Sequence, residues 1–87
     1  MEVIFQIRLY SNKNKKGKTF SKLFNHLEQL PVLGDSISLL RFSNETTVIS
    51  RDYDLDLNLW YIIIDSIKIP NNEEEEILNL MVDSGWE

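Results

Sequence analysis

The most restrictive feature of the sequence is an apolar run over residues 59–69, Leu-Trp-Tyr-Ile-Ile-Ile-Asp-Ser-Ile-Lys-Ile. β-Branched and aromatic residues dominate it, which favours a strand. Pro70 follows, and proline cannot donate a hydrogen bond to a sheet ladder. Residues 59–64 are all apolar and leave no polar face, so we expect this strand to lie inside the sheet, covered on both sides. The run predicts the centre of a core, not an active site.

Composition limits the class of protein. The chain has 87 residues, so we expect a single domain over residues 1–87, and 43% hydrophobic residues indicate a globular chain. The absence of cysteine excludes disulfides, thiolate nucleophiles and Cys-ligated zinc. No leader is evident, and no apolar run reaches the roughly 18 residues needed to cross a bilayer. We therefore expect a cytoplasmic protein without membrane contact.

Charge is divided unevenly along the chain. The net charge is -5, but residues 1–30 carry six basic and two acidic residues, whereas residues 31–87 carry three basic and twelve acidic ones. This balance disfavours nucleic-acid binding, which needs Lys and Arg to replace counterions on the phosphates. It is compatible with a protein partner that has a basic surface.

The first half of the chain predicts a strand, a loop and a helix. Residues 2–10 alternate apolar and polar side chains, which indicates a strand, and residues 11–18 form a polar, basic loop. From residue 19 the spacing becomes helical and predicts an amphipathic helix over residues 19–30, which ends before Pro31. The apolar stripe of this helix consists of Phe20, Leu23, Phe24, Leu27 and Leu30.

The second half predicts three strands and another helix. Residues 36–42 and 46–53 are expected to form strands joined by a short polar connection at residues 43–45. A turn at residues 54–58 leads into the apolar strand, so the three strands form a meander. Asn71 or Asn72 is expected to cap a final helix that stops at Gly85.

The order of elements predicts an α+β domain, β-α-β-β-β-α. We expect a four-stranded, largely antiparallel sheet with two helices covering one face. A small half-open barrel is the alternative architecture.

One motif suggests phosphate binding. The predicted strand, the loop over residues 12–19 and the predicted helix together resemble the P-loop with its GxxxxGK[ST] pattern. That resemblance implies that Lys18 reaches the phosphates, that Thr19 contacts magnesium and that Asp65 holds the metal through water. Asn12 replaces the first glycine, however, and lysines fill the expected backbone nest. The phosphate-binding alternative consists of Lys15, Lys16, Lys18 and Thr19.

The remaining residues do not predict an enzyme. Carboxylates at every second position from Asp52 resemble the opening of an EF-hand loop. In a loop that starts at Asp54, however, Leu59 occupies the glycine position and Asp65 the twelfth. The single histidine, His26, has no second ring for a metal and no adjacent nucleophile. We therefore predict no metal, no cofactor and no catalytic residues.

Acidic residues suggest a partner-binding surface. The run of four glutamates before Ile77 is usually a solvated first turn of a helix. Together with the aspartates near residue 54, it could instead form an acidic face that binds a basic surface. Trp86, if exposed, would anchor such an interface. The predicted partner-binding residues are Asp52, Asp54, Asp56, Glu73, Glu74, Glu75, Glu76 and Trp86.

Two short patterns carry a family resemblance. Leu-Pro-x-x-Gly-Asp-x-Ile at residues 30–37 and Val-x-Ser-Arg-x-Tyr-Asp at residues 48–54 resemble the LPxxGDxI and VxxRxYD pattern of small β-rich proteins of bacteria and phages. Most of these proteins have no known function, so the resemblance implies no site residues. It implies a turn that sets the start of one strand and then its hairpin partner.

Two functional hypotheses follow. The first is a non-catalytic protein-binding module, a phage or mobile-element inhibitor that occupies a host protein through its acidic face. The second is a binder of nucleotides or phosphorylated ligands that uses the basic loop. A homodimer remains open in both.

Overall fold

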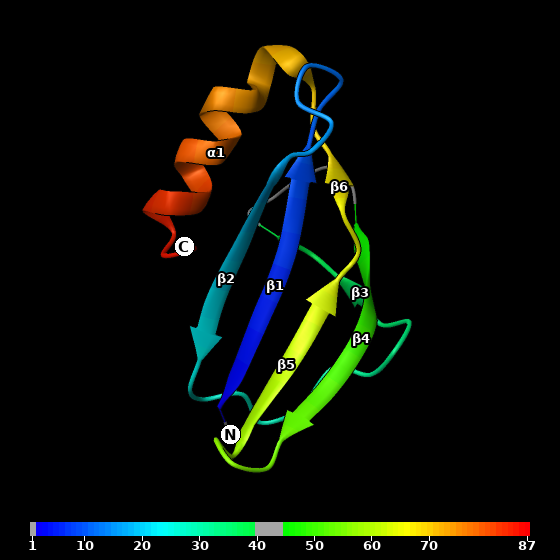
Figure 1. Ribbon diagram of the computed structural model, residues 1–87, viewed down its shortest axis with the longest axis vertical. Helices are drawn as coiled ribbons and strands as arrows, with labels where there is room; N and C mark the ends of the chain where they lie inside the picture. The colour runs from blue at the N-terminus through cyan, green and yellow to red at the C-terminus, as the bar shows by residue number, and fades with distance from the viewer. Residues whose placement is uncertain (1, 40–44) are drawn as a thin grey trace.

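The computed structural model describes residues 2–39 and 45–87, and this part of the chain is mostly β-structure (Figure 1). A short 3-10 turn, η1, leads into α1, the one α-helix of the described residues. The elements in chain order are β1 (Val3–Tyr10), β2 (Lys18–Phe24), β3 (Ser36–Ile37), β4 (Thr46–Asp54), β5 (Leu59–Ile64), β6 (Ile67–Lys68), η1 (Asn71–Glu73) and α1 (Glu74–Asp83).

The strands form one sheet that curls into a half-barrel (Figure 1). Its order is β2-β1-β5-β4-β3, and β6 pairs with β1 beyond the end of β5. The neighbours β1 and β2, β3 and β4, and β4 and β5 are antiparallel, whereas β1 is parallel to both β5 and β6. The expected meander is therefore present as β3-β4-β5, with β1 inserted beside β5.

The predicted helix over residues 19–30 is wrong, and with it the two-helix β-α-β-β-β-α fold. Residues 18–24 instead form β2, which pairs with β1 along seven positions, from Val3 opposite Phe24 to Leu9 opposite Lys18. Phe20 and Phe24 are four residues apart, a spacing that suits both a helix and a strand. Residues 25–30 have no regular structure. Thr19, Phe20 and Phe24 favour a strand. Pairing with β1 along the whole segment outweighs the helix propensity of Lys22 and Leu23.

The central strand lies inside the sheet as expected, but it is not covered on both faces. β5 has β1 on one side and β4 on the other. Ile62 and Ile64 are buried, whereas Tyr61 and Ile63, which point to the other face, are half-buried. The covered face is the concave one, where α1 packs against the sheet. Residues 2–39 and 45–87 contain no second α-helix that could cover the convex face. The apolar run also breaks after Ile64, so that its end forms β6.

One further boundary differs from expectation. The strand predicted over residues 36–42 is short, since β3 ends at Ile37. Residues 40–44, with most of the predicted connection at residues 43–45, lie outside the described part of the chain. The family-like patterns do meet in space: Gly34 N donates to Val48 O at 2.9 Å, and Val48 N donates to Asp35 O at 3.0 Å. The turn thus places β3 beside β4.

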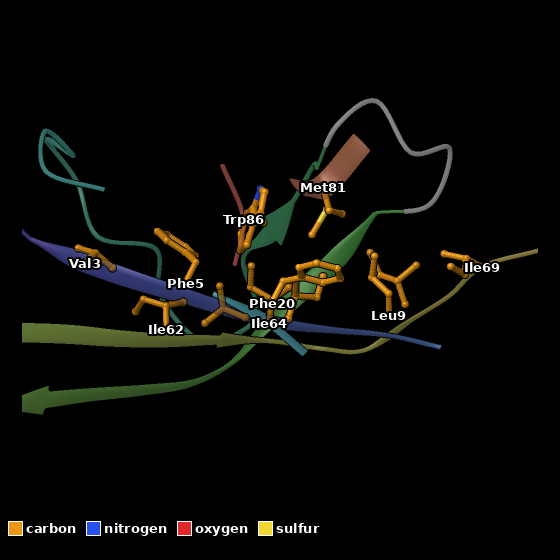
Figure 2. Close-up of a cluster of buried hydrophobic side chains, with 12 residues drawn as sticks. Val3, Phe5, Leu9, Phe20, Ile62, Ile64, Ile69, Met81 and Trp86 are labelled. Atoms are coloured by element: carbon orange, nitrogen blue, oxygen red, sulfur yellow. The ribbon is translucent and has the colours of Figure 1, made fainter. Parts of the chain in front are cut away.

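The core lies between the concave face of the sheet and α1 (Figure 2). Alternate residues of β1 point into it, and Phe20, Ile62 and Ile64 join them from the neighbouring strands. Met81 is the buried residue of α1. The alternate residues of β1 are Val3, Phe5, Ile7 and Leu9.

The end of α1 is fixed to the sheet by a Schellman turn. Gly85 has φ 93°, as predicted for a glycine stop, and Trp86 N donates to Met81 O at 3.0 Å. The turn directs Trp86 onto Phe24 with a 6.3 Å distance between ring centroids. Glu87 and Ser21 then exchange backbone hydrogen bonds of 2.9 and 3.2 Å, which attaches the chain end to β2. No helix in residues 2–39 or 45–87 is long and apolar enough to span a membrane.

Candidate protein-binding surface

The acidic residues singled out in the sequence divide into two groups. Asp52, Asp54 and Asp56 belong to the hairpin that joins β4 and β5, whereas residues 73–76 lie at the start of α1. These places are at opposite ends of the long axis of the molecule, which measures 40 Å (Figure 1). The two groups therefore do not form one acidic face.

Trp86 belongs to the core. Its side chain is 4% exposed and packs against Phe24. A partner could not reach this ring without displacing the end of α1.

The glutamates at the start of α1 face the basic loop between β1 and β2. The Ser11 hydroxyl donates to Glu74 Oε2 at 3.1 Å, and Lys13 N donates to Asn71 Oδ1 at 3.2 Å. Asn71 thus accepts a bond from the loop, and neither helical segment has a side-chain cap. A hollow at this place is lined by Lys13 and Lys18 and by Glu74 and Glu75. Basic and acidic residues that the two functional hypotheses had assigned to separate sites therefore lie close together. Glu74, through its bond from Ser11, and Asn71, through its bond from Lys13, help to hold the helix against the β1–β2 loop.

The basic loop is not built as a phosphate cradle. A P-loop directs backbone N–H groups at the phosphates and leads into the N-terminus of a helix. Here Lys18 and Thr19 open β2, while Lys15 and Lys16 are exposed in the loop. Four amides of the loop already donate within the protein, those of Ser11, Lys13, Asn14 and Gly17.

Arg8 of β1 also binds the loop through hydrogen bonds. Its Nη1 donates to the carbonyl oxygens of Lys15 and Lys16 at 2.9 and 3.1 Å, and its Nε donates to Ser66 Oγ at 3.1 Å. A phosphate near Lys18 would also meet the carboxylates across the hollow. These contacts disfavour phosphate binding by the loop.

The β4–β5 hairpin has a tightly organised turn at residues 55–58. Asp54 Oδ1 accepts hydrogen bonds from Asp56 N at 3.0 Å and Leu57 N at 3.1 Å. The Tyr53 hydroxyl bonds to the side chain of Asn58, which has φ 53°. Asparagine tolerates this left-handed conformation better than most residues do. The turn is therefore held by its own side chains.

Two leucines project from this organised turn. Leu55, between Asp54 and Asp56 in the sequence, is 84% exposed, and Leu57, directly after Asp56, is 61% exposed. Neither leucine belongs to the core or packs against it. The sequence predicted a turn over residues 54–58 and gave these two leucines no role. The detectable signal was the presence of large apolar residues at positions where a turn needs none.

Aromatic residues support the hairpin on its concave face. The Tyr53 ring lies 5.0 Å from the Trp60 ring between centroids, and the Arg51 guanidinium lies 4.9 Å from the Trp60 ring. Tyr53 remains 40% exposed. Asp52 points to the opposite face, where its Oδ2 accepts a 3.2 Å bond from Ser50 Oγ. The hairpin thus offers an aromatic side chain on one face and a carboxylate on the other.

No group of three or more His, Cys, Asp or Glu residues that could hold a metal ion occurs in the described ranges. A scan against protein-family models and searches of curated proteins and of solved structures find no match for this chain. The hairpin geometry is therefore the basis for a functional proposal.

Proposed function

We propose that this chain is a non-catalytic protein-binding module and that the β4–β5 hairpin contacts its partner. The observation that carries the proposal is the pair of exposed leucines on a turn held by its own hydrogen bonds. Apolar side chains surrounded by charged ones are typical of protein interfaces. A turn that is already ordered loses little conformational entropy on binding.

The charge of the hairpin indicates what kind of partner surface it would bind. Asp52, Asp54 and Asp56 give it a local acidic character that favours a basic surface. A module of this kind acts by covering the surface that it binds, so the proposed role is inhibition of a host protein by occupancy.

The test is a capture experiment with hairpin variants. We expect the tagged protein to retain a stoichiometric partner from a bacterial lysate after nuclease treatment. Leu55→Ser with Leu57→Ser should weaken its capture by tenfold or more, since full burial of a leucine side chain contributes about 1.5–3 kcal/mol. Asp52→Asn, Asp54→Asn and Asp56→Asn together should weaken it about tenfold, because exposed charge pairs contribute about 0.2–1 kcal/mol each. Asparagine keeps the Oδ1 acceptor that residue 54 supplies to the turn.

The matched control changes Glu73, Glu75 and Glu76 to glutamine, which removes three charges at the other end of the molecule and leaves the Ser11–Glu74 hydrogen bond in place. This variant should capture the same partner as the unaltered protein. Equal capture by the leucine variant and the unaltered protein would contradict the proposal. Recovery of protein only from the untreated lysate would point to nucleic acid instead.

A further inference from the structure

β4 has an open outer edge over residues 49–54. β3 pairs with β4 at Thr46 and Thr47, and the turn before β3 bonds to Val48. Beyond that point the described residues place no strand beside β4 on the side away from β5 (Figure 1). The backbone N–H and C=O groups that point outward along residues 49–54 have no sheet partner from residues 2–39 or 45–87. Such an edge is a template for another strand.

The side chains along this edge divide between the two faces of the sheet. Asp52 lies opposite Tyr61 and Asp54 opposite Leu59, on the convex face. Tyr53 lies opposite Trp60 on the concave face, toward which Arg51 also points. A register shift between Val48 and Ser50 sets this alternation. An added strand would meet two carboxylates on one face and an aromatic ring on the other.

The carboxylates oppose pairing with a second copy of the chain. Two β4 strands paired antiparallel about residue 52 would place Asp52 opposite its own copy. Pairing about residue 53 would place Asp52 opposite Asp54. Like charges directly opposite each other destabilise a sheet. A strand with basic side chains at alternate positions would instead meet opposite charges.

We propose that the outer edge of β4 takes up an extended segment of the partner as an added strand, with Lys or Arg at alternate positions opposite Asp52 and Asp54. The proposal rests on the proposed function and specifies the partner. Backbone hydrogen bonds to residues 49–54 supply affinity, and the alternate basic side chains supply register. The residue between the two basic ones lies beside Tyr53, whose 40% exposed ring suits an apolar or aromatic side chain.

The test uses synthetic peptides of eight residues with lysine at alternate positions and isoleucine or threonine between them. Two further peptides carry N-methyl groups, one on each alternate set of residues. In a strand, successive N–H groups point to opposite sides, so only one set can bond to β4. We expect the parent peptide to bind in a calorimetric titration. One N-methylated form should retain this affinity and the other should lose at least about tenfold, because it loses several backbone hydrogen bonds at once.

Protein variants complete the test. Asp52→Asn with Asp54→Asn should weaken binding of the parent peptide several-fold, whereas Glu76→Gln with Asp83→Asn removes the same charge from α1 and should change nothing. Equal binding of both N-methylated peptides would overturn strand addition and indicate a contact through charge alone. Absence of binding by the parent peptide would overturn it as well. Neither outcome affects the capture experiment with the leucine variants, so failure of strand addition and failure of the proposed function are distinguishable.

Discussion

Trp86→Ala is expected to lower the free energy of unfolding by about 3–5 kcal/mol, the usual range when a buried tryptophan is truncated. The ring is 4% exposed and meets Phe24 edge to face, and Phe24 in turn meets Phe5 at 5.1 Å between centroids. Small domains have about 5–15 kcal/mol of total stability, so this one change would remove a large fraction of it. The measurement is urea denaturation followed by far-ultraviolet circular dichroism.

Trp86→Ala should lower the free energy of unfolding by more than the cost of the cavity that it leaves, because Trp86 also fixes the end of the chain to the sheet. Trp86 N closes the turn onto Met81 O, and the next residue bonds to Ser21 of β2. Trp86 is the one large apolar residue among residues 84–87, so without its ring this segment keeps mainly its polar contacts with β2. Val82→Ala, at a residue of α1 that is 54% exposed, is the control and should change stability by no more than about 0.5 kcal/mol. A loss below 1 kcal/mol in Trp86→Ala would contradict the core position of this residue.

The sequence predicted those elements whose signal is local. Alternation over residues 2–10 indicated β1, and the apolar run after residue 58 indicated β5. The glycine stop at Gly85 was likewise visible, because it depends on one residue and its neighbours. The segment that became β2 was not predictable in this way. The spacing of its apolar residues suits both a helix and a strand. Pairing with β1 decides between them, and the spacing within one segment contains no information about that pairing.

The candidate surface was predictable only in part. The spacing of Asp52 and Asp54 was evident, but their separation from the glutamates at the start of α1 depends on how the whole chain folds. The same applies to Trp86, since the direction of the chain after Gly85 decides whether this ring lies inside or outside. Charge and aromatic content indicate what a residue can bind, but only tertiary structure determines whether a partner can reach it.

Gly17→Ala is expected to destabilise the protein more than Gly34→Ala, although both glycines have positive φ, of 71° and 88°. The left-handed conformation alone disfavours alanine by about 1–2 kcal/mol, and this term applies at both positions. At Gly17 a Cβ would also overlap the carbonyl oxygen of Leu9 and approach Tyr10 Cβ at 2.9 Å, whereas at Gly34 it would meet nothing within 4 Å. We therefore expect at least about 2 kcal/mol at Gly17, since a backbone overlap adds to the conformational term.

The additional destabilisation in Gly17→Ala should be accompanied by local opening of the β1–β2 loop and of the start of α1. A Cβ at this position pushes the β1–β2 loop away from β1, and that loop bonds to the start of the helix through Ser11 and Lys13. Hydrogen exchange should therefore accelerate at the Lys13 and Asn14 amides and in the first turn of α1 in Gly17→Ala, and remain unchanged there in Gly34→Ala. Equal stability losses in the two variants, with no change in exchange at α1, would mean that the loop shifts freely. The contacts of Ser11 and Lys13 would then not be what holds the helix in place.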